Sequence, residues 1–172
     1  NNIISSAEIQ KTLQQVISQI LVKNFNDDKK ICLYGLNKVQ STSFINIFKE
    51  VIPQNLILNY FNNENSKLED LFIDYENISK DAKSLEKIIF IPCEITSDYE
   101  NDIAKYGNNK SEILNWLVEG AKEIIKTQKI YISKECENFK DRFNLVSLFV
   151  KELNLTKTPK DSKSVVSTYE NV

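Results

Sequence analysis

The sequence has 172 residues, 41% of them hydrophobic and 27% charged, which is typical of a globular protein with one compact domain and a tail. Its net charge of −2 excludes a protein that is drawn to DNA or to an anionic membrane over its whole surface, so a nucleic-acid interface would have to be a local basic patch. Histidine is absent and the three cysteines, Cys32, Cys93 and Cys136, are widely spaced, which argues against a metal site and a histidine-based catalytic centre. The cysteines are therefore expected to be buried thiols in a reducing compartment.

The start of the chain and its apolar runs give no sign of a membrane protein. No apolar run approaches the roughly 20 residues that span a bilayer, and Asn1-Asn2-Ile3-Ile4 lacks the basic region of a signal peptide. We therefore expect no membrane partner and a cytoplasmic location. The sequence contains no methionine, so we also expect it to be a fragment, a processed product or pieces of a longer protein.

The first predicted element is a helix over residues 5–24, in which apolar residues recur every three or four positions. Ser5 and Glu8 have the spacing of a capping box at its start. A polar turn follows, and residues 31–34 form the continuous apolar run of a short buried strand. After a polar loop, residues 44–51 are predicted to form a second helix.

The middle of the chain contains further short apolar runs that are predicted to be strands. They are 56–61, 71–74 and 87–92. The second of these could instead belong to a helix that starts at Leu68. Strands that alternate with helices favour an α/β fold with a mainly parallel sheet.

The last third is predicted to be helical, with one helix over 109–125 and another that Ser133 caps. Asn109 and Glu112 offer a cap for the first of these helices. Gly120 lies inside it and indicates close packing against a neighbour, because glycine in a helix costs about 1 kcal/mol relative to alanine.

The predicted strand at 31–34 and the helix after it follow one another like the parts of a phosphate-binding P-loop, G-x-x-x-x-G-K-[ST]. Here the stretch reads Gly35-Leu36-Asn37-Lys38-Val39-Gln40-Ser41-Thr42, so the first Gly and the final Thr are in register. Gln40 stands where a second Gly would let the backbone approach phosphate, and Ser41 stands where Lys would supply positive charge. Lys38 could partly compensate. The alternative is an ordinary strand, turn and helix without a ligand.

This segment resembles the P-loop of the superfamily-three helicases that are fused to phage, plasmid and poxvirus-type primases, and both Gly35 and Phe44 fall where that family has Gly and Phe. The IIFIP stretch over 88–92 resembles the family's "IIIPF" strand. The SEILNWLVEG stretch over 111–120 resembles its "SGILNWxLEG" helix and is the most specific match, while 132–150 resembles the helix that follows. The resemblance implies a P-loop NTPase fold.

The same resemblance implies which parts of the activity are lost. Asp74 and Glu76 resemble the acidic end of a Walker B strand near Mg²⁺, although a half-buried strand that ends in solvated acids is the alternative. Between Glu76 and Lys87 the family has several dozen more residues, including a sensor Asn and the approach to an arginine finger, where this chain has about ten. An arginine finger and a P-loop Lys each contribute orders of magnitude to phosphoryl transfer, so we expect no ATP turnover.

The predicted elements divide the chain into four segments. They are an N-terminal helix (1–27), a P-loop-like α/β core (28–106), a helical C-terminal part (107–155) and a linker or tail (156–172). The expected fold is α/β, with a small P-loop NTPase-like, mainly parallel sheet followed by the helical C-terminal part.

Lys122, Lys126 and Lys129 form a modest basic group that could contact DNA phosphates, although lysines near a helix C-terminus are also expected on structural grounds.

The leading hypothesis is a non-hydrolysing helicase-like module of a mobile-element or viral DNA replication protein, in the host cytosol or at a viral replication site. It would need no cofactor and would act through a protein partner or self-association, with DNA as a further candidate partner. One alternative is an active ATP-dependent DNA helicase fragment that uses ATP and Mg²⁺. Another is a stand-alone protein-binding regulator or inhibitor with no nucleic-acid role.

Overall fold

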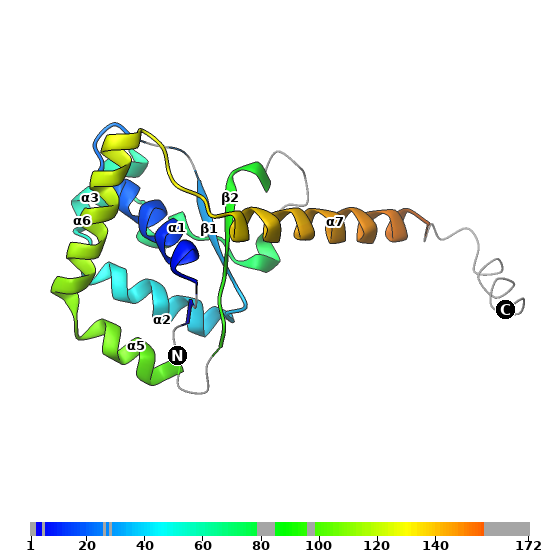
Figure 1. Ribbon diagram of the computed structural model, residues 1–172, viewed down its shortest axis with the longest axis horizontal. Coiled ribbons are helices and arrows are strands. Elements are labelled where there is room, and N and C mark those ends of the chain that lie inside the picture. Colours follow the sequence, from blue (N-terminus) through cyan, green and yellow to red (C-terminus); the bar gives the residue numbers. More distant parts are fainter. Residues whose placement is uncertain are drawn as a thin grey trace, which may run out of the picture. The chain divides into compact units, whose positions relative to one another are not determined.

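The computed structural model describes residues 3–4, 6–25, 27, 29–78, 85–95 and 99–156 (Figure 1). The chain divides into two compact units, Asn1–Lys140 and Asp141–Val172. Within the described residues the protein is mostly helical, with six α-helices and a two-stranded parallel sheet, which confirms the predicted α/β class. None of the described helices is long and apolar enough to cross a membrane.

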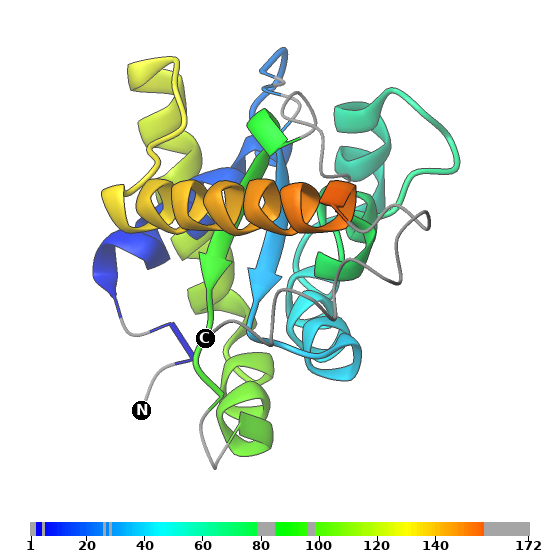
Figure 2. The same cartoon turned by 90° about the vertical axis from the view of Figure 1, so that its right-hand side faces the viewer.

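Two parallel strands lie at the centre of the first unit. The strand β1 (Lys30–Tyr34) pairs in register with β2 (Ile88–Pro92), and Figure 2 shows the two strands side by side and pointing the same way. Both were predicted from their apolar runs. A single parallel bridge joins Ile31 to Phe72 along the other edge of β1. The predicted strand over 71–74 is therefore reduced to one bridging residue.

Each face of this small sheet is buried. Successive side chains of a strand point to opposite faces, and one face contributes four residues to the main hydrophobic core: Ile31, Leu33, Ile89 and Ile91. Cys32 and Phe90 are paired in the register and point to the other face, where the ring of Phe139 lies 5.9 Å from that of Phe90. Burial on both faces explains why the strands are continuous apolar runs rather than alternating ones.

Six α-helices account for most of the described chain. They are α1 (Ala7–Ser18), α2 (Lys38–Lys49), α3 (Gln54–Phe61), α5 (Tyr99–Gly107), α6 (Lys110–Thr127) and α7 (Lys134–Thr156). Three short 3-10 helices join them: η1 (Gln19–Leu21), η2 (Leu68–Leu71) and η3 (Tyr75–Asn77). The predicted strand over 56–61 is wrong, because this segment is α3 with Pro53 at its N-cap. Leu56, Ile57, Tyr60 and Phe61 pack on the core with the spacing of one helix face, a pattern that a short apolar run can hide.

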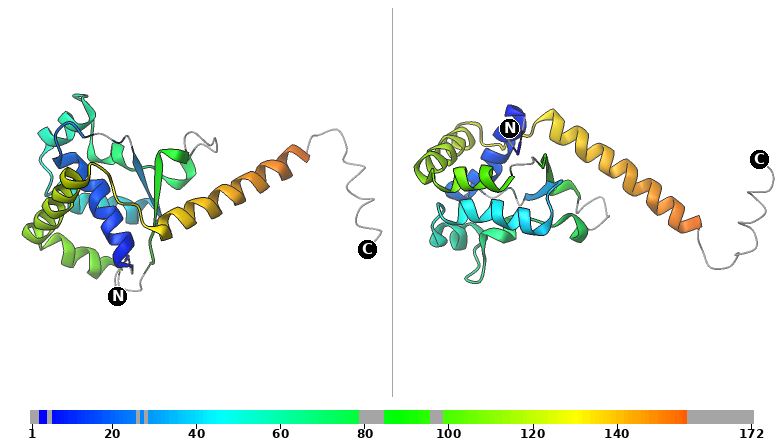
Figure 3. Two further views of the ribbon diagram at one scale, coloured as in Figure 1. Left: turned by 45° about the horizontal axis from the view of Figure 1, so that its top comes forward. Right: turned by 90° about the horizontal axis from the view of Figure 1, so that it is seen from below.

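The helices α1 and α6 pack closely along their length, and the views of Figures 1 and 3 agree in placing them side by side. Gly120 lies at the contact, because a Cβ atom there would meet Ser18 Oγ at 2.5 Å and Gln14 Cγ at 2.8 Å. The side-chain amide of Gln14 also donates to the Trp116 carbonyl at 2.6 Å. The prediction that Gly120 permits close packing against a neighbour is confirmed.

The ends of the helices follow the predictions only in part. The N-cap of α1 is Ser6, and its hydroxyl makes no cap bond but donates to Glu135 at 3.0 Å. The predicted capping box involves a different residue, Ser5. Ser5 lies outside the described residues. Ser133 does cap α7, because its Oγ accepts from the Cys136 N–H at 3.2 Å. The predicted tail lies outside the described residues after Thr156.

All three cysteines are free thiols. Cys32 and Cys136 are buried and Cys93 is half-buried. Burial raises the pKa of Cys32 to about 12, with a further contribution from Asp74. Burial also raises the pKa of Cys93 to about 12, helped by Cys32 and Cys136. These thiols are protonated at neutral pH and behave as small apolar side chains, in agreement with the prediction.

Candidate functional site

The turn from β1 to α2 holds the residues that the sequence aligns with a P-loop. Gly35 leaves the strand with a φ of 100°, a conformation that favours glycine. A Cβ atom there would overlap the carbonyl oxygen of Cys93, the residue that follows β2. The Cys93 N–H donates to the Tyr34 carbonyl at 2.8 Å, which holds the two segments together at this point. The glycine is therefore required by the close approach of β2, whatever else the turn does.

The first turn of α2 is closed by its own side chains. Asn37 is the N-cap, and its Oδ1 accepts from the Gln40 N–H at 3.0 Å. In return, Gln40 Oε1 accepts from the Asn37 N–H at 3.0 Å, which completes a capping box. The helix was predicted to begin at residue 44 but begins at Lys38, because this pair stabilises an earlier start. In a P-loop, backbone N–H groups at this place bind phosphate.

The other residues of the motif also have local roles. The Thr42 hydroxyl, which would hold Mg²⁺ in a P-loop, donates to the Lys38 carbonyl at 2.8 Å. The Ser41 N–H donates to the Asn37 carbonyl at 2.9 Å as an ordinary helix bond. Lys38 is exposed, and its ammonium group has no partner among the described residues. The turn between strand and helix is therefore only Gly35, Leu36 and Asn37.

Tyr99, at the start of α5, fixes this first turn from the side. Its hydroxyl donates to the Gln40 carbonyl at 2.7 Å, and the residue is only 7% exposed. Burial raises the pKa of Tyr99 to about 12, with a smaller contribution from Cys93. No pattern in the sequence indicated this residue, because the contact joins two helices that are distant along the chain.

The two predicted Walker B acids lie beside the carboxyl end of β1. Asp74 comes two residues after the Phe72 bridge and is the N-cap of η3, which also contains Glu76. Both carboxylates are exposed, and Asp74 makes no side-chain cap bond. The neighbouring Tyr75 packs on Tyr34 with ring centroids 5.2 Å apart. The structure therefore brings the acids to the same edge of the sheet as Gly35, and no group of three or more His, Cys, Asp or Glu side chains in the described part could hold a metal ion.

The predicted basic group lies on a different element. Lys122 and Lys126 belong to α6 and Lys129 follows it, and all three side chains are exposed. The Lys122 ammonium is paired with the Glu119 carboxylate at 2.6 Å. The charge available for a DNA phosphate is correspondingly reduced.

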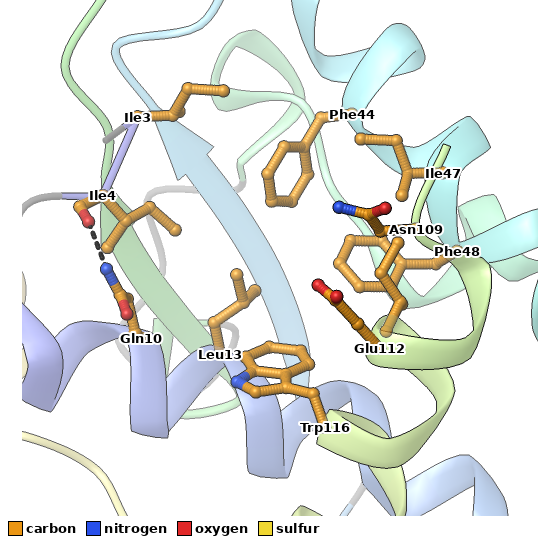
Figure 4. Close-up of a pocket in the computed structure, with 11 residues that line it drawn as sticks. Ile3, Ile4, Gln10, Leu13, Phe44, Ile47, Phe48, Asn109, Glu112 and Trp116 are labelled. Carbon is orange, nitrogen blue, oxygen red and sulfur yellow. Dashed lines mark hydrogen bonds between the residues drawn. The ribbon is translucent and has the colours of Figure 1, made fainter. Parts of the chain in front are cut away.

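A cavity that the sequence did not predict opens between the N-terminal segment, α1, α2 and α6 (Figure 4). It encloses about 250 Å³. Its wall is mainly apolar and includes Leu13, Phe44, Phe48 and Trp116. The Trp116 ring packs on Phe48 with centroids 6.3 Å apart, so this residue is part of the wall of the cavity and of the core beside it. No sequence signal could reveal the cavity, because its residues come from four separate segments.

Comparisons with known proteins leave the chemistry of these sites to be inferred from their geometry. No family model, curated protein or solved structure matches the chain. The edge of the sheet is a compact strand, turn and helix, and the cavity is a separate feature whose lining includes none of the residues from Gly35 to Thr42.

Proposed function

We propose that the chain is a non-hydrolysing, helicase-like module of a viral or mobile-element DNA replication protein, which acts by contacting a protein partner or further copies of itself and, more weakly, DNA. The succession of β1, a glycine turn and α2 beside a parallel β2 supports a relation to P-loop NTPase sheets. The resemblance of 88–92 and 111–120 to primase-linked helicases supports the class of protein.

The observation that carries the proposal is the missing P-loop lysine at the start of α2, and not the closed first turn of that helix. Opening the capping box of Asn37 and Gln40 would cost only about 1 kcal/mol, which nucleotide binding could supply. The missing lysine is decisive instead, because Ser41 occupies its place and a P-loop lysine contributes orders of magnitude to phosphoryl transfer. Lys38 is the first residue of α2, three positions before Ser41, so its charge does not stand at the position of a P-loop lysine.

An exposed apolar stripe on α6 supports action through protein contacts. Leu114, Val118 and Ile125 are large hydrophobic residues that remain exposed. Their spacing of four and seven places them on one side of the helix, next to the stripe that packs against α1. Contiguous exposed apolar side chains of this kind commonly mark protein interfaces.

A nucleotide titration tests the proposal directly. We expect calorimetry with ATP, with and without Mg²⁺, to show no saturable binding up to millimolar nucleotide, and no phosphate release. Thr42→Ala is expected to behave like the wild type, since the Thr42 hydroxyl already donates to Lys38.

The matched control is Thr127→Ala, because the Thr127 hydroxyl makes the same kind of bond to the Glu123 carbonyl, at 2.8 Å, far along the chain. Micromolar, Mg²⁺-dependent ATP binding that Thr42→Ala abolishes and Thr127→Ala preserves would show an active ATPase site and overturn the proposal.

A further inference from the structure

Few polar residues line the cavity between α1, α2 and α6, and they differ in whether their side chains make hydrogen bonds. Gln10, Asn109 and Glu112 contribute to its lining. The Gln10 amide already donates to the Ile4 carbonyl at 2.6 Å. In contrast, the side chains of Asn109 and Glu112 have no hydrogen-bond or ion-pair partner among the described residues. Within the described part of the chain, these are the two polar side chains of the lining that make no such bond.

These two residues occupy the positions of an unformed capping box. Asn109 is the N-cap of α6 and Glu112 is three residues later, yet Asn109 makes no side-chain cap bond. Figure 4 shows both side chains directed over the cavity instead. The contrast with α2 is informative, because the equivalent pair there, Asn37 and Gln40, closes its helix with two bonds.

Among the described residues that line the cavity, Glu112 is the one charged side chain. Glu112 carries the carboxylate, and the lysine closest to it along α6, Lys110, is paired with Glu50 at 2.9 Å. The rings of Phe44, Phe48 and Trp116 make the rest of the wall apolar and aromatic.

We propose that this cavity binds an amphipathic organic cation, with a ring or short alkyl body among the apolar residues and an ammonium group at its mouth. The ammonium group donates to the Glu112 carboxylate and to the side-chain carbonyl of Asn109. The size is suitable, because an apolar cavity of about 150 Å³ holds benzene, and this one encloses about 250 Å³. The site is independent of the proposed helicase-like role, since it shares no residue with the turn before α2.

The single tryptophan of the chain, Trp116, lies in the wall of the cavity and reports its occupancy by fluorescence. The full chain is titrated with three probes of similar size and different charge: 2-phenylethylamine, 2-phenylethanol and 3-phenylpropionate. We expect a saturable change in Trp116 fluorescence with the amine, binding of the alcohol about tenfold weaker, and no binding of the anion.

Two variants of exposed carboxylates on α6 complete the experiment, and neither is expected to disturb folding. Glu112→Gln is expected to weaken the amine about tenfold while leaving the alcohol unchanged. Glu123→Gln, which removes a carboxylate of the same helix outside the cavity, is expected to leave both unchanged. Three outcomes would overturn the proposal. They are equal affinities for the amine and the alcohol, an amine affinity that Glu112→Gln leaves unchanged, and no saturable change in Trp116 fluorescence with any probe.

Discussion

Single residues of the turn before α2 have partners that differ from those the motif suggested. Gly35 was singled out as the first glycine of a P-loop, but the contact that requires it is the Cys93 carbonyl. Gln40 was singled out as a departure from glycine, and it proves to be half of a capping box with Asn37. The sequence identified both positions as special, because glycine and the departures from a motif are visible in it. It could not identify Cys93 or Tyr99 as their neighbours, since these contacts depend on the tertiary fold.

Tyr99 tests the importance of this local network. We expect Tyr99→Phe to lower the free energy of unfolding by about 1 kcal/mol at pH 7, because the Gln40 carbonyl loses its donor. Urea unfolding measures the change. Tyr34→Phe is the control, since Tyr34 is 37% exposed and its hydroxyl makes no hydrogen bond among the described residues, and it is expected to keep the stability of the wild type.

The same variant changes the response to alkaline pH. The pKa of Tyr99 is raised from 10.0 to about 12, so its neutral form favours the folded state. This contribution is fully present below pH 10 and is lost as pH rises towards 12. Wild-type protein should therefore lose stability more steeply than Tyr99→Phe in that window, and parallel curves would contradict the role of the buried hydroxyl.

At the scale of elements, segments with a clear apolar spacing or a continuous apolar run were predictable, and the segment of α3 was not. The helices α1, α6 and α7 and the strands β1 and β2 were all predicted, because their apolar spacing or continuous apolar runs are clear. The prediction of a strand in the segment of α3 was wrong, since its short apolar run fits the period of a helix as well as that of a strand. The cavity was also missed, because a pocket depends on how four segments meet rather than on the pattern within any one of them.

The contact between α1 and α6 is tested by Gly120→Ala. A Cβ atom there meets the fully buried Ser18 side chain, so we expect a loss of about 1–3 kcal/mol from overpacking, against a gain of about 1 kcal/mol in helix propensity. Chemical denaturation measures the balance. Gly107→Ala is the matched control, because nothing lies within 4 Å of a Cβ atom at that position, at the end of α5. Ser18→Ala in the Gly120→Ala background should restore part of the loss, and equal effects of the two glycine substitutions would contradict close packing at Gly120.

At the scale of the whole molecule, charge is balanced and no large basic surface is expected. The chain carries 22 basic and 24 acidic side chains. On α6 the pattern continues, with Glu119 paired to Lys122 and Glu123 placed between the two helical lysines. The same helix exposes three large apolar side chains, those of Leu114, Val118 and Ile125, but it has no excess of positive charge. Protein contacts are therefore better supported than nucleic-acid contacts as the main activity of the proposed module.

A DNA titration at two salt concentrations separates these contributions. In the basic group, Lys126 and Lys129 have no ion-pair partner among the described residues. If these two lysines contact phosphates, we expect weak duplex binding at about 50 mM salt, a slope of log K against log salt of about −2, and little binding left at about 200 mM. Replacing both lysines by Gln should abolish the low-salt binding, whereas Lys122→Gln should have a smaller effect because Glu119 already pairs with that charge. Fluorescence anisotropy with a labelled duplex measures the binding of the wild type and of both variants.

Binding absent at both salt concentrations would favour a protein-binding regulator with no nucleic-acid role. Equal effects of the paired and unpaired lysines would show that the ion pair on α6 does not limit the charge offered to DNA.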